Sequence, residues 1–395
     1  MRFLKNPSNV YISLLVFYFM QGTMIPTGGT IISQLIILAA MLMGLYFTVR
    51  TIALHNKPSF FTGLNILFLM FVLYGTALLF SDNHYIVRHS GAEVPNMSFL
   101  KKIVLSIPNI YTFYYFSRKG YLTEQALKKW VVVYMMAAVF IFIDNKLTTI
   151  HVLLLEGTDV EEVTNNMSYL FVALIPAVAV FKKNNILQYG LLSFCMIFVV
   201  LGMKRGAVLV GVLSILYFLN FNFRNHRSIS KLKVLAFSIL IVLVGVYMVR
   251  YMMETSDFFS QRIIETEEGG SSGRDAIYKV FWNHFKNETD TIKFLFGNGA
   301  NATLGIGVNY AHNDWLEIAI NQGLVGLIVY AFYWLCFYTT IRKTKQNLSA
   351  KLVLTLSFIS FFTMTFFSMS YTEYSIFSTT VFGYYLAHCR EVERI

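Results

Sequence analysis

Residues 186–221 read ILQYGLLSFCMIFVVLGMKRGAVLVGVLSILYFLNF, two apolar runs separated by a short turn that contains Lys204 and Arg205. The hydrocarbon core of a bilayer is about 30 Å thick, and a helix that crosses it needs roughly 20 mostly apolar residues. Both runs approach that length. They therefore predict a pair of transmembrane helices joined by a very short connection.

The rest of the chain has the same character. Of its 395 residues, 56% are hydrophobic and only 13% are charged, whereas about a quarter of the residues of a soluble domain are charged. We expect an all-α, polytopic membrane helical bundle of about 12 transmembrane helices, with residues 1–395 forming one integral membrane domain. The candidate spans are residues 8–24, 28–50, 60–80, 99–117, 127–144, 167–182, 186–203, 206–221, 231–252, 312–341, 351–371 and 374–389.

Basic residues gather in alternate loops, as they do on the cytoplasmic side of membrane proteins. Placing Arg2 and Lys5 inside puts most of the other basic residues inside as well, so both termini are expected to be cytoplasmic. No small-residue cleavage site follows the first apolar run, which is therefore expected to be a retained anchor. The net charge of +11 then reflects topology and does not indicate a nucleic-acid partner.

Lys204 and Arg205 break this alternation, because the predicted topology puts their turn on the outer face. One interpretation is that both side chains extend from helix ends to lipid headgroups. The other is an anion-binding site, since a guanidinium presents a planar fork that matches phosphate oxygens. Both interpretations are open at this point.

Two outer segments are long enough to have a role. The smaller loop, residues 145–166, is acidic and is expected to be a solvated surface. The large extracytoplasmic loop, residues 253–311, contains a capping-box spacing between Ser272 and Asp275, which predicts a surface helix that begins at Arg274. One face of this helix is marked by Ile277, Val280, Phe281 and Phe285.

Later in the same loop, residues 297–302 read GNGANA and formally fit the dinucleotide-binding fingerprint. That motif requires a βαβ unit around it, and here another glycine-containing loop follows, so the fit is interpreted as coincidental. The glycines are expected instead to let the loop approach a bulky substrate. A loop of this length between spans is usually functional or disordered.

His312 stands where the large loop meets the tenth predicted span. A histidine at a membrane interface is commonly a simple boundary residue, but an imidazole also titrates near neutral pH and can move a proton. Two arginines are expected on the same membrane face. Asp314 and Glu317 fall in the first turns of the following helix, where acids complement the helix dipole, and Glu317 is expected to point away from His312.

Three pieces of the chain form a recognisable set: Met203-Lys204-Arg205-Gly206-Ala207; Ser272-Gly273-Arg274-Asp275 with Trp282; and His312-Asn313 followed by Leu316, Gly323 and Gly326. This set resembles the bacterial O-antigen polymerase and O-antigen ligase superfamily, the Wzy-type and WaaL-type membrane glycosyltransferases. The resemblance covers roughly residues 190–335. It implies a many-span helical bundle with one large outer loop.

The resemblance also implies metal-independent transfer of a sugar chain from undecaprenyl diphosphate to an acceptor hydroxyl, without a cofactor. By this carry-over Arg205 and Arg274 hold the diphosphate and His312 is the general base. Substrate binding is expected to involve Lys204, Asn313 and Asp314, together with the same two arginines. The scattered cysteines, Cys195, Cys336 and Cys389, do not suggest a metal site or a disulfide framework.

We expect a polymerase that joins lipid-linked repeat units into O-antigen, capsular polysaccharide or exopolysaccharide on the outer face of the bacterial cytoplasmic membrane. The preference rests on how numerous and variable such polymerases are. One alternative is an O-antigen ligase that transfers the glycan to a lipid A core. Another is a secondary transporter or lipid-linked glycan flippase, which would have charged or broken helices at mid-membrane depth. A chain-length regulator and a flippase of the same pathway are the implied protein partners.

Overall fold

The computed structural model describes residues 6–21, 30–87, 91–155, 164–182, 185–225, 274–307, 309–367 and 376–389, with isolated positions between 232 and 264. This part of the chain is predominantly helical. Five of its helices are long and apolar enough to cross a membrane: Ile31–Ile52, Phe60–Leu79, Glu124–Val152, Arg205–Asn225 and Asp314–Lys343. The prediction of a helical membrane protein is thereby confirmed, while the number of spans and their sidedness stay predictions.

The predicted spans in the described ranges coincide with helices. The span predicted at 231–252 lies largely outside the described residues. The bundle helices are α1 (Pro7–Met20), α2 (Ile31–Ile52), α3 (Phe60–Leu79), α4 (Met97–Arg118), α5 (Glu124–Leu155), α6 (Ser168–Val178) with the 3-10 turn η2 (Ala179–Phe181), α7 (Asn185–Leu201), α8 (Arg205–Asn225), α14 (Asp314–Lys343), α15 (Leu348–Met364) and α16 (Ile376–Ala387).

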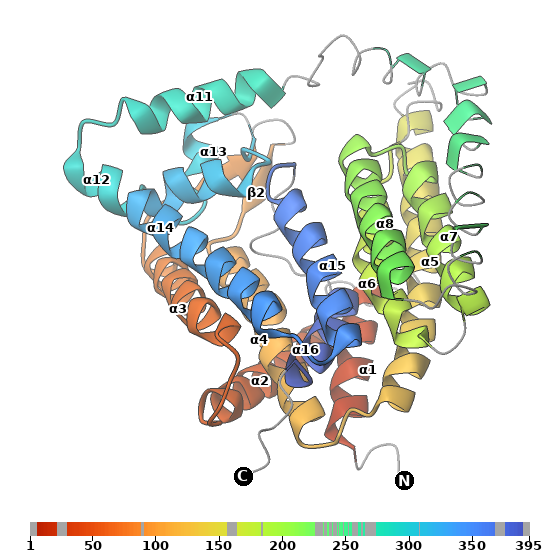
Figure 1. Cartoon of the computed structure of the whole chain (residues 1–395). Helices are drawn as coiled ribbons and strands as arrows, with labels where there is room; N and C mark the ends of the chain where they lie inside the picture. The colour runs from red at the N-terminus through yellow and green to blue at the C-terminus, as the bar shows by residue number, and fades with distance from the viewer. Residues whose placement is uncertain are drawn as a thin grey trace.

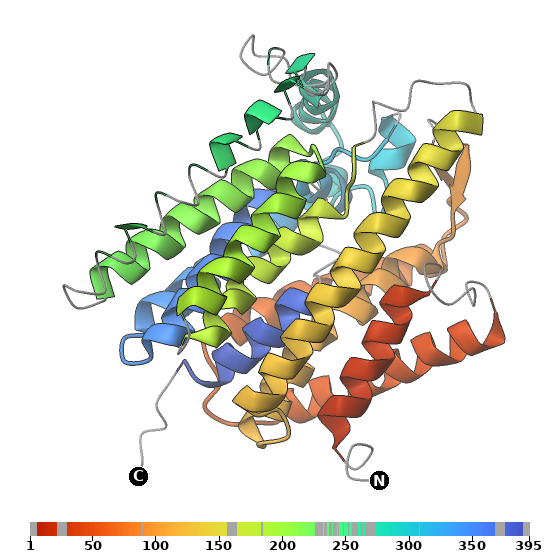
Figure 2. The same ribbon diagram turned by 90° about the vertical axis from the view of Figure 1, so that its right-hand side faces the viewer.

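Helix α4 lies inside the bundle and packs against α2, α3 and α16 (Figures 1 and 2). It is not among the five helices apolar enough to span by composition, because it carries many polar residues. These face neighbouring helices: Tyr11 Oη donates to Asn109 Oδ1 at 2.6 Å, and Tyr111 Oη donates to Asn65 Oδ1 at 2.7 Å. A helix enclosed by others needs less apolar surface than one exposed to lipid.

One predicted boundary was wrong. Helix α5 continues to Leu155, past the predicted start of an acidic loop at residue 145. No glycine or proline occurs between Glu124 and Leu155, so nothing in the backbone ends the helix earlier. The acidic residues assigned to that loop, Glu156, Asp159, Glu161 and Glu162, lie outside the described residues.

Basic turns lie at one end of the bundle. Asn6, before α1, bonds to Tyr121 O in the turn between α4 and α5 at 2.8 Å. The same end carries Arg50 in the last turn of α2, and Arg342 and Lys343 in the last turn of α14. At the opposite end are the short helices α11 (Arg274–Lys286), α12 (Thr291–Phe296) and α13 (Thr303–Ile306), with the hairpin of β1 (Tyr85–Val87) and β2 (Ala92–Val94) (Figure 1).

Helix α11 is described from Arg274 to Lys286, which confirms a helix in this segment. Ser272 and Gly273 lie outside the described residues, so the start of the helix at Arg274 stays a prediction. Its packed face contains Phe281 and Phe285, which are buried with α14 residues in one apolar cluster. Val280 was wrongly assigned to this face and is 49% exposed. It precedes Phe281 by one position, and adjacent residues are about 100° apart around a helix.

Candidate functional site

Helix α14 is broken at Gly323, whose backbone is in the left-handed region at φ 68°. The first segment, from Asp314 to Gln322, lies among α11, α12 and α13, and the long apolar segment follows the break (Figure 1). The prediction of one uninterrupted span from residue 312 to 341 was therefore wrong. A glycine accepts this conformation without the steric cost that other residues have.

The loop after α12 binds to this break. Gly297 also has positive φ, at 77°, and a Cβ on it would lie 2.4 Å from Asn321 C. Asn298 N donates to Ile320 O at 2.9 Å, and Gly299 N donates to Asn321 O at 3.0 Å. These bonds satisfy carbonyls that the break leaves without a helical partner. The glycines predicted to approach a substrate thus pack against α14, between α12 and α13.

Glu317 is fully buried and organises the residues before α14. Its carboxylate accepts from the backbone N–H of Ala311 at 2.5 Å, from Thr303 Oγ1 at 2.8 Å and from Asn321 Nδ2 at 3.2 Å. The expectation that Glu317 points away from His312 was wrong, because the carboxylate turns back toward the residue immediately before it. Three donors fix the carboxylate, and the carboxylate in turn fixes the loop.

His312 lies between this anchor and the start of α14. Its φ is 52°, a left-handed conformation that is uncommon outside glycine and clusters at functional sites. Asn313 caps the helix, since its Oδ1 accepts from Trp315 N at 3.0 Å and from Leu316 N at 3.2 Å. Tyr278 of α11 donates from its hydroxyl to His312 O at 3.3 Å.

Two cations act on the imidazole. Burial lowers the pKa of His312 below its ordinary value, and the positive charges of Arg274 and Lys204 lower it further. Like charges disfavour the protonated ring. His312 is therefore neutral over more of the physiological pH range than an ordinary histidine, which is the form a general base requires.

Lys204 belongs to the short turn between α7 and α8, which the sequence predicted at this position. Gly206 follows at the start of α8, and a Cβ there would lie 2.5 Å from Tyr169 Oη and 3.3 Å from Phe367 Cβ. The turn therefore packs closely against α6 and the residues that follow α15. Arg205 is the first residue of α8, and its predicted contact with a diphosphate stays a prediction.

Arg274 is the first described residue of α11. Besides His312, its charge acts on the phenols of Tyr278 and Tyr169. Burial raises the pKa of Tyr278, and Arg274 opposes that rise. The charges of Arg274 and Lys204 therefore both act on His312, although the three residues belong to segments that are far apart in the sequence.

Asp314 occupies a different environment from the one expected of a substrate ligand. It is fully buried, its carboxylate accepts from Tyr330 Oη at 2.9 Å, and its backbone N–H donates to Thr365 O at 2.8 Å. This placement supports a role in joining α14 to the end of α15, and it does not support the predicted role in substrate binding.

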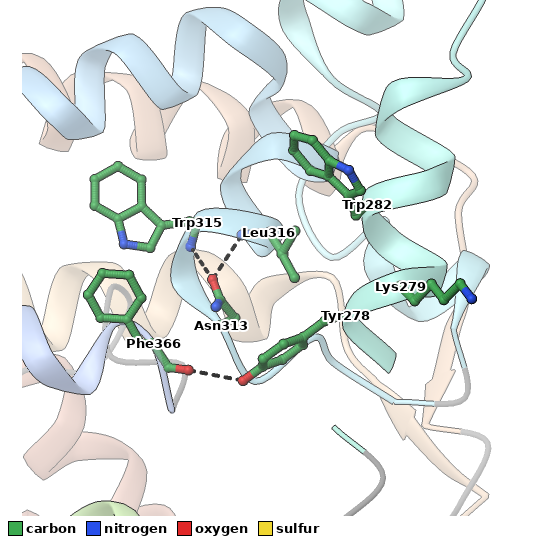
Figure 3. Close-up of a pocket in the computed structure, with 7 residues that line it drawn as sticks. All are labelled: Tyr278, Lys279, Trp282, Asn313, Trp315, Leu316 and Phe366. Carbon is green, nitrogen blue, oxygen red and sulfur yellow. Dashed lines mark hydrogen bonds between the residues drawn. The ribbon is translucent and has the colours of Figure 1, made fainter. Parts of the chain in front are cut away.

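An aromatic pocket of about 490 Å³ opens beside the cationic site. In Figure 3, side chains of α11 face those at the start of α14, and Lys279 points away from the rings. Trp315 is fixed in the wall because its Nε1 donates to Thr365 Oγ1 at 3.0 Å. The lining residues are Tyr278, Lys279, Trp282, Asn313, Trp315, Leu316 and Phe366.

Sequence reasoning missed Tyr278 and Phe366 as parts of the site. A signal for Tyr278 was present, because Arg274, Tyr278 and Trp282 are spaced four residues apart and such residues share one side of a helix. No comparable signal marks Phe366, which follows an apolar helix. Among the described residues, no group of three or more His, Cys, Asp and Glu side chains is arranged to hold a metal ion.

Residues 190–331 match the sequence model of a protein family described as O-antigen ligase. The match confirms the resemblance to the O-antigen ligase and polymerase superfamily. It includes the α7–α8 turn, α11 and the first part of α14, which are the segments that build the site. Members of this family are membrane enzymes of the glycosyltransferase kind. No curated protein matches the chain.

Proposed function

We propose that this protein transfers a glycan from a polyprenyl diphosphate, undecaprenyl diphosphate in bacteria, to a hydroxyl of an acceptor glycan at the outer face of the cytoplasmic membrane. The observation that carries the proposal is the convergence of Lys204, Arg274 and His312 next to an aromatic pocket. Cations suit a diphosphate, a neutral imidazole suits proton removal, and aromatic faces suit sugar rings.

In the proposed reaction, the acceptor oxygen attacks the anomeric carbon of the donor sugar. The bond from that carbon to the diphosphate oxygen breaks, and the diphosphate leaves with the electron pair. His312 removes the proton of the acceptor hydroxyl. A positioned base of this kind is typically worth about 10²- to 10⁴-fold in rate.

Arg274 and Lys204 act on the leaving group. Negative charge grows on the diphosphate as the bond breaks, so fixed positive charges stabilise the transition state more than the ground state. Arg205, next to Lys204, is proposed to add a planar fork to the same diphosphate. The half-buried setting strengthens these interactions relative to those in bulk water.

Polymerisation of lipid-linked repeat units is our preferred form of the reaction, because polymerases of this superfamily are numerous and vary widely in sequence. Transfer to a lipid A core is the second candidate, and the description of the matching family as O-antigen ligase favours it. The two reactions use the same leaving group and the same base. They differ in the acceptor, so the products in cells distinguish them.

The decisive experiment is a gel of surface polysaccharide from cells that lack the protein, complemented with the wild-type chain, His312→Ala or Arg274→Ala. A polymerase deletion leaves a single repeat unit on its normal final acceptor. A ligase deletion leaves long chains on the lipid carrier. In either case only the wild-type chain should restore the normal pattern.

The comparison needs a control variant that changes the surface of α11 but leaves the site intact. Lys286→Gln removes an exposed charge at the far end of α11 and should restore the pattern fully. All variants should be present in the membrane at equal amounts. A normal ladder from both His312→Ala and Arg274→Ala would overturn the proposed chemistry, and an unchanged ladder in the deletion strain would favour a transporter.

A further inference from the structure

We propose that the aromatic pocket is the subsite for a sugar ring of the acceptor glycan, with Trp282 and Phe366 as its principal binding surfaces. The inference rests on the proposed glycan transfer and names the part of the substrate that binds here. It follows from three features of the pocket: its position along α11, the exposure of its rings, and its continuity with the general base.

The position is set by the helix. Arg274, Tyr278 and Trp282 lie four residues apart on α11, and a helix rises 1.5 Å per residue. Trp282 is therefore about 12 Å along the helix axis from Arg274, with Tyr278 midway. This distance is longer than one sugar ring, so the donor sugar next to a diphosphate at Arg274 leaves Trp282 for a ring of the acceptor glycan.

The rings are exposed where a ligand could cover them. Trp282 is 53% exposed and Phe366 is 41% exposed, and both line the same cavity. The C–H faces of a sugar ring pack on aromatic faces, so a pocket walled by aromatic side chains suits a pyranose. Lys279 points away from the cavity (Figure 3), which leaves a binding surface without a charged group aimed into it.

We assign the pocket to the acceptor glycan and not to the donor glycan because the pocket adjoins His312, the proposed general base. Asn313, which lines the pocket, directly follows His312, and Tyr278, which also lines it, bonds to His312 O. In a displacement, the attacking hydroxyl enters on the side opposite the leaving diphosphate. The glycan that carries this hydroxyl must therefore extend from the base, and the pocket is the cavity that adjoins it.

The test uses the full-length protein in nanodiscs and the free repeat-unit oligosaccharide, released by mild acid from the lipid carrier of cells lacking the protein. This probe has no diphosphate and no lipid, so it reports on a glycan subsite alone. Its affinity is measured by calorimetry or by saturation-transfer NMR. Trp282→Ala is expected to weaken binding about tenfold, a loss typical of an aromatic side chain that the bound partner covers.

Two further variants separate stacking from loss of structure. Trp282→Tyr keeps an aromatic face and should bind within about threefold of the wild type. Phe296→Ala removes an exposed aromatic side chain of α12, 51% exposed and outside the pocket, and should leave the affinity unchanged. A membrane-interface role for Trp282 predicts that Trp282→Ala and Phe296→Ala bind the oligosaccharide equally well, which would overturn the inference.

The outcomes also separate this inference from the proposed function. If the wild type converts the lipid-linked substrate but does not bind the free oligosaccharide, the acceptor subsite is wrong and the function stands. If Trp282→Ala raises only the KM for the lipid-linked donor, the pocket holds donor sugars and the acceptor assignment is overturned. If His312→Ala and Arg274→Ala retain full transfer, the proposed function itself fails.

Discussion

The hydroxyl of Tyr278 lies 3.3 Å from the backbone carbonyl oxygen of His312 and donates a hydrogen bond to it. The same hydroxyl lies 2.9 Å from Phe366 O. Tyr278 therefore links three segments: the surface helix α11, the residue proposed as general base, and the chain that follows α15. On the other side of His312, the carboxylate of Glu317 accepts a hydrogen bond from the N–H of Ala311. The base is thus fixed from both sides by groups that do not themselves take part in the proton transfer.

Removing this hydroxyl should lower turnover without removing the base. Tyr278→Phe keeps the ring that lines the pocket but loses both backbone contacts, and each hydrogen bond is worth about 1 kcal/mol. We expect kcat to fall roughly tenfold while the KM for the donor changes little. Steady-state kinetics with the lipid-linked substrate measures both constants.

The matched control is Tyr121→Phe, which removes an exposed hydroxyl at the opposite end of the bundle and should retain wild-type kinetics. A Tyr278→Phe enzyme with unchanged kcat would show that α11 does not position His312. A parallel loss in both variants would indicate a general effect of the substitution.

The pH dependence of kcat/KM should show how the positive charges near His312 affect its pKa. Because burial and the charges of Arg274 and Lys204 lower the pKa of His312, kcat/KM should stay high below pH 6.5 and fall only when the pH drops through this lowered pKa. Lys204→Gln removes one of the charges that disfavour protonation, so the pKa should rise. The acid limb of the profile should then move to higher pH.

Lys286→Gln changes the same residue type at a distance from the imidazole and should leave the acid limb in place. A limb that moves equally in both variants would reflect overall charge and not proximity to His312. A limb that moves to lower pH in Lys204→Gln would contradict the predicted sign.

The contact between Gly297 and the break in α14 predicts that alanine substitutions at two nearby glycines differ strongly in their effect on the free energy of unfolding. Gly297 and Gly299 both have positive φ, but a Cβ would collide with Asn321 only at Gly297, and nothing lies within 4 Å of a Cβ at Gly299. Gly299→Ala should cost about 1–2 kcal/mol of unfolding free energy through its backbone conformation. Gly297→Ala should cost roughly 3 kcal/mol or more, because crowding adds to that strain.

Thermal unfolding of the detergent-purified variants measures this difference. Gly323→Ala should resemble Gly297→Ala, since a Cβ at Gly323 would lie 2.5 Å from Gly297 N. Equal midpoints for Gly297→Ala and Gly299→Ala would show that the contact between the loop and the break does not contribute to stability.

Much of the fold was predictable because lipid restricts the choice. A long apolar run has few alternatives to a helix in a membrane, and the helical spacing of Ile277, Phe281 and Phe285 predicted a helix in the segment of α11. The break at Gly323 was not predictable, because a glycine inside an apolar run is usually tolerated within a helix. Only the approach of Gly297, from a distant part of the sequence, makes the left-handed conformation favourable there.

The residues of the candidate site were predictable only in part. The sequence indicated that Arg274 and His312 belong together, but adjacent residues in a turn cannot be distinguished by sequence alone. The charge of Lys204 acts on His312, whereas the prediction gave the catalytic role to Arg205 and a substrate-binding role to both residues. Met203, directly before this pair, has a φ of 51°, a backbone conformation that the sequence does not reveal.

The roles of Arg205 and Lys204 can be distinguished by exchanging arginine and lysine at each position. Arg205→Lys keeps the charge but loses the planar fork, so transfer should fall sharply if Arg205 binds the diphosphate with two hydrogen bonds. Lys204→Arg keeps the charge near His312 and should be tolerated better. Transfer rates at saturating donor test the pair, and normal activity of Arg205→Lys would reduce Arg205 to a simple charge.

Glu317 offers a test of scaffold against chemistry. Its carboxylate accepts from Ala311 N, Thr303 Oγ1 and Asn321 Nδ2. In Glu317→Gln the amide oxygen can still accept from Ala311 N–H, and the amide NH₂ can face Thr303, whose hydroxyl can rotate to accept. Only the bond from Asn321 Nδ2 loses its acceptor. We therefore expect Glu317→Gln to keep most of its activity, at a cost of about 1 kcal/mol of stability.

Glu317→Ala leaves buried donors unsatisfied and opens a cavity, so it should lose about 3 kcal/mol or more, together with the alignment of His312. Thermal unfolding and transfer rates of the two variants, with the exposed Glu93→Gln as control, distinguish the roles. If Glu317→Gln were folded and inactive, Glu317 would be a proton-transfer group and not an anchor for His312.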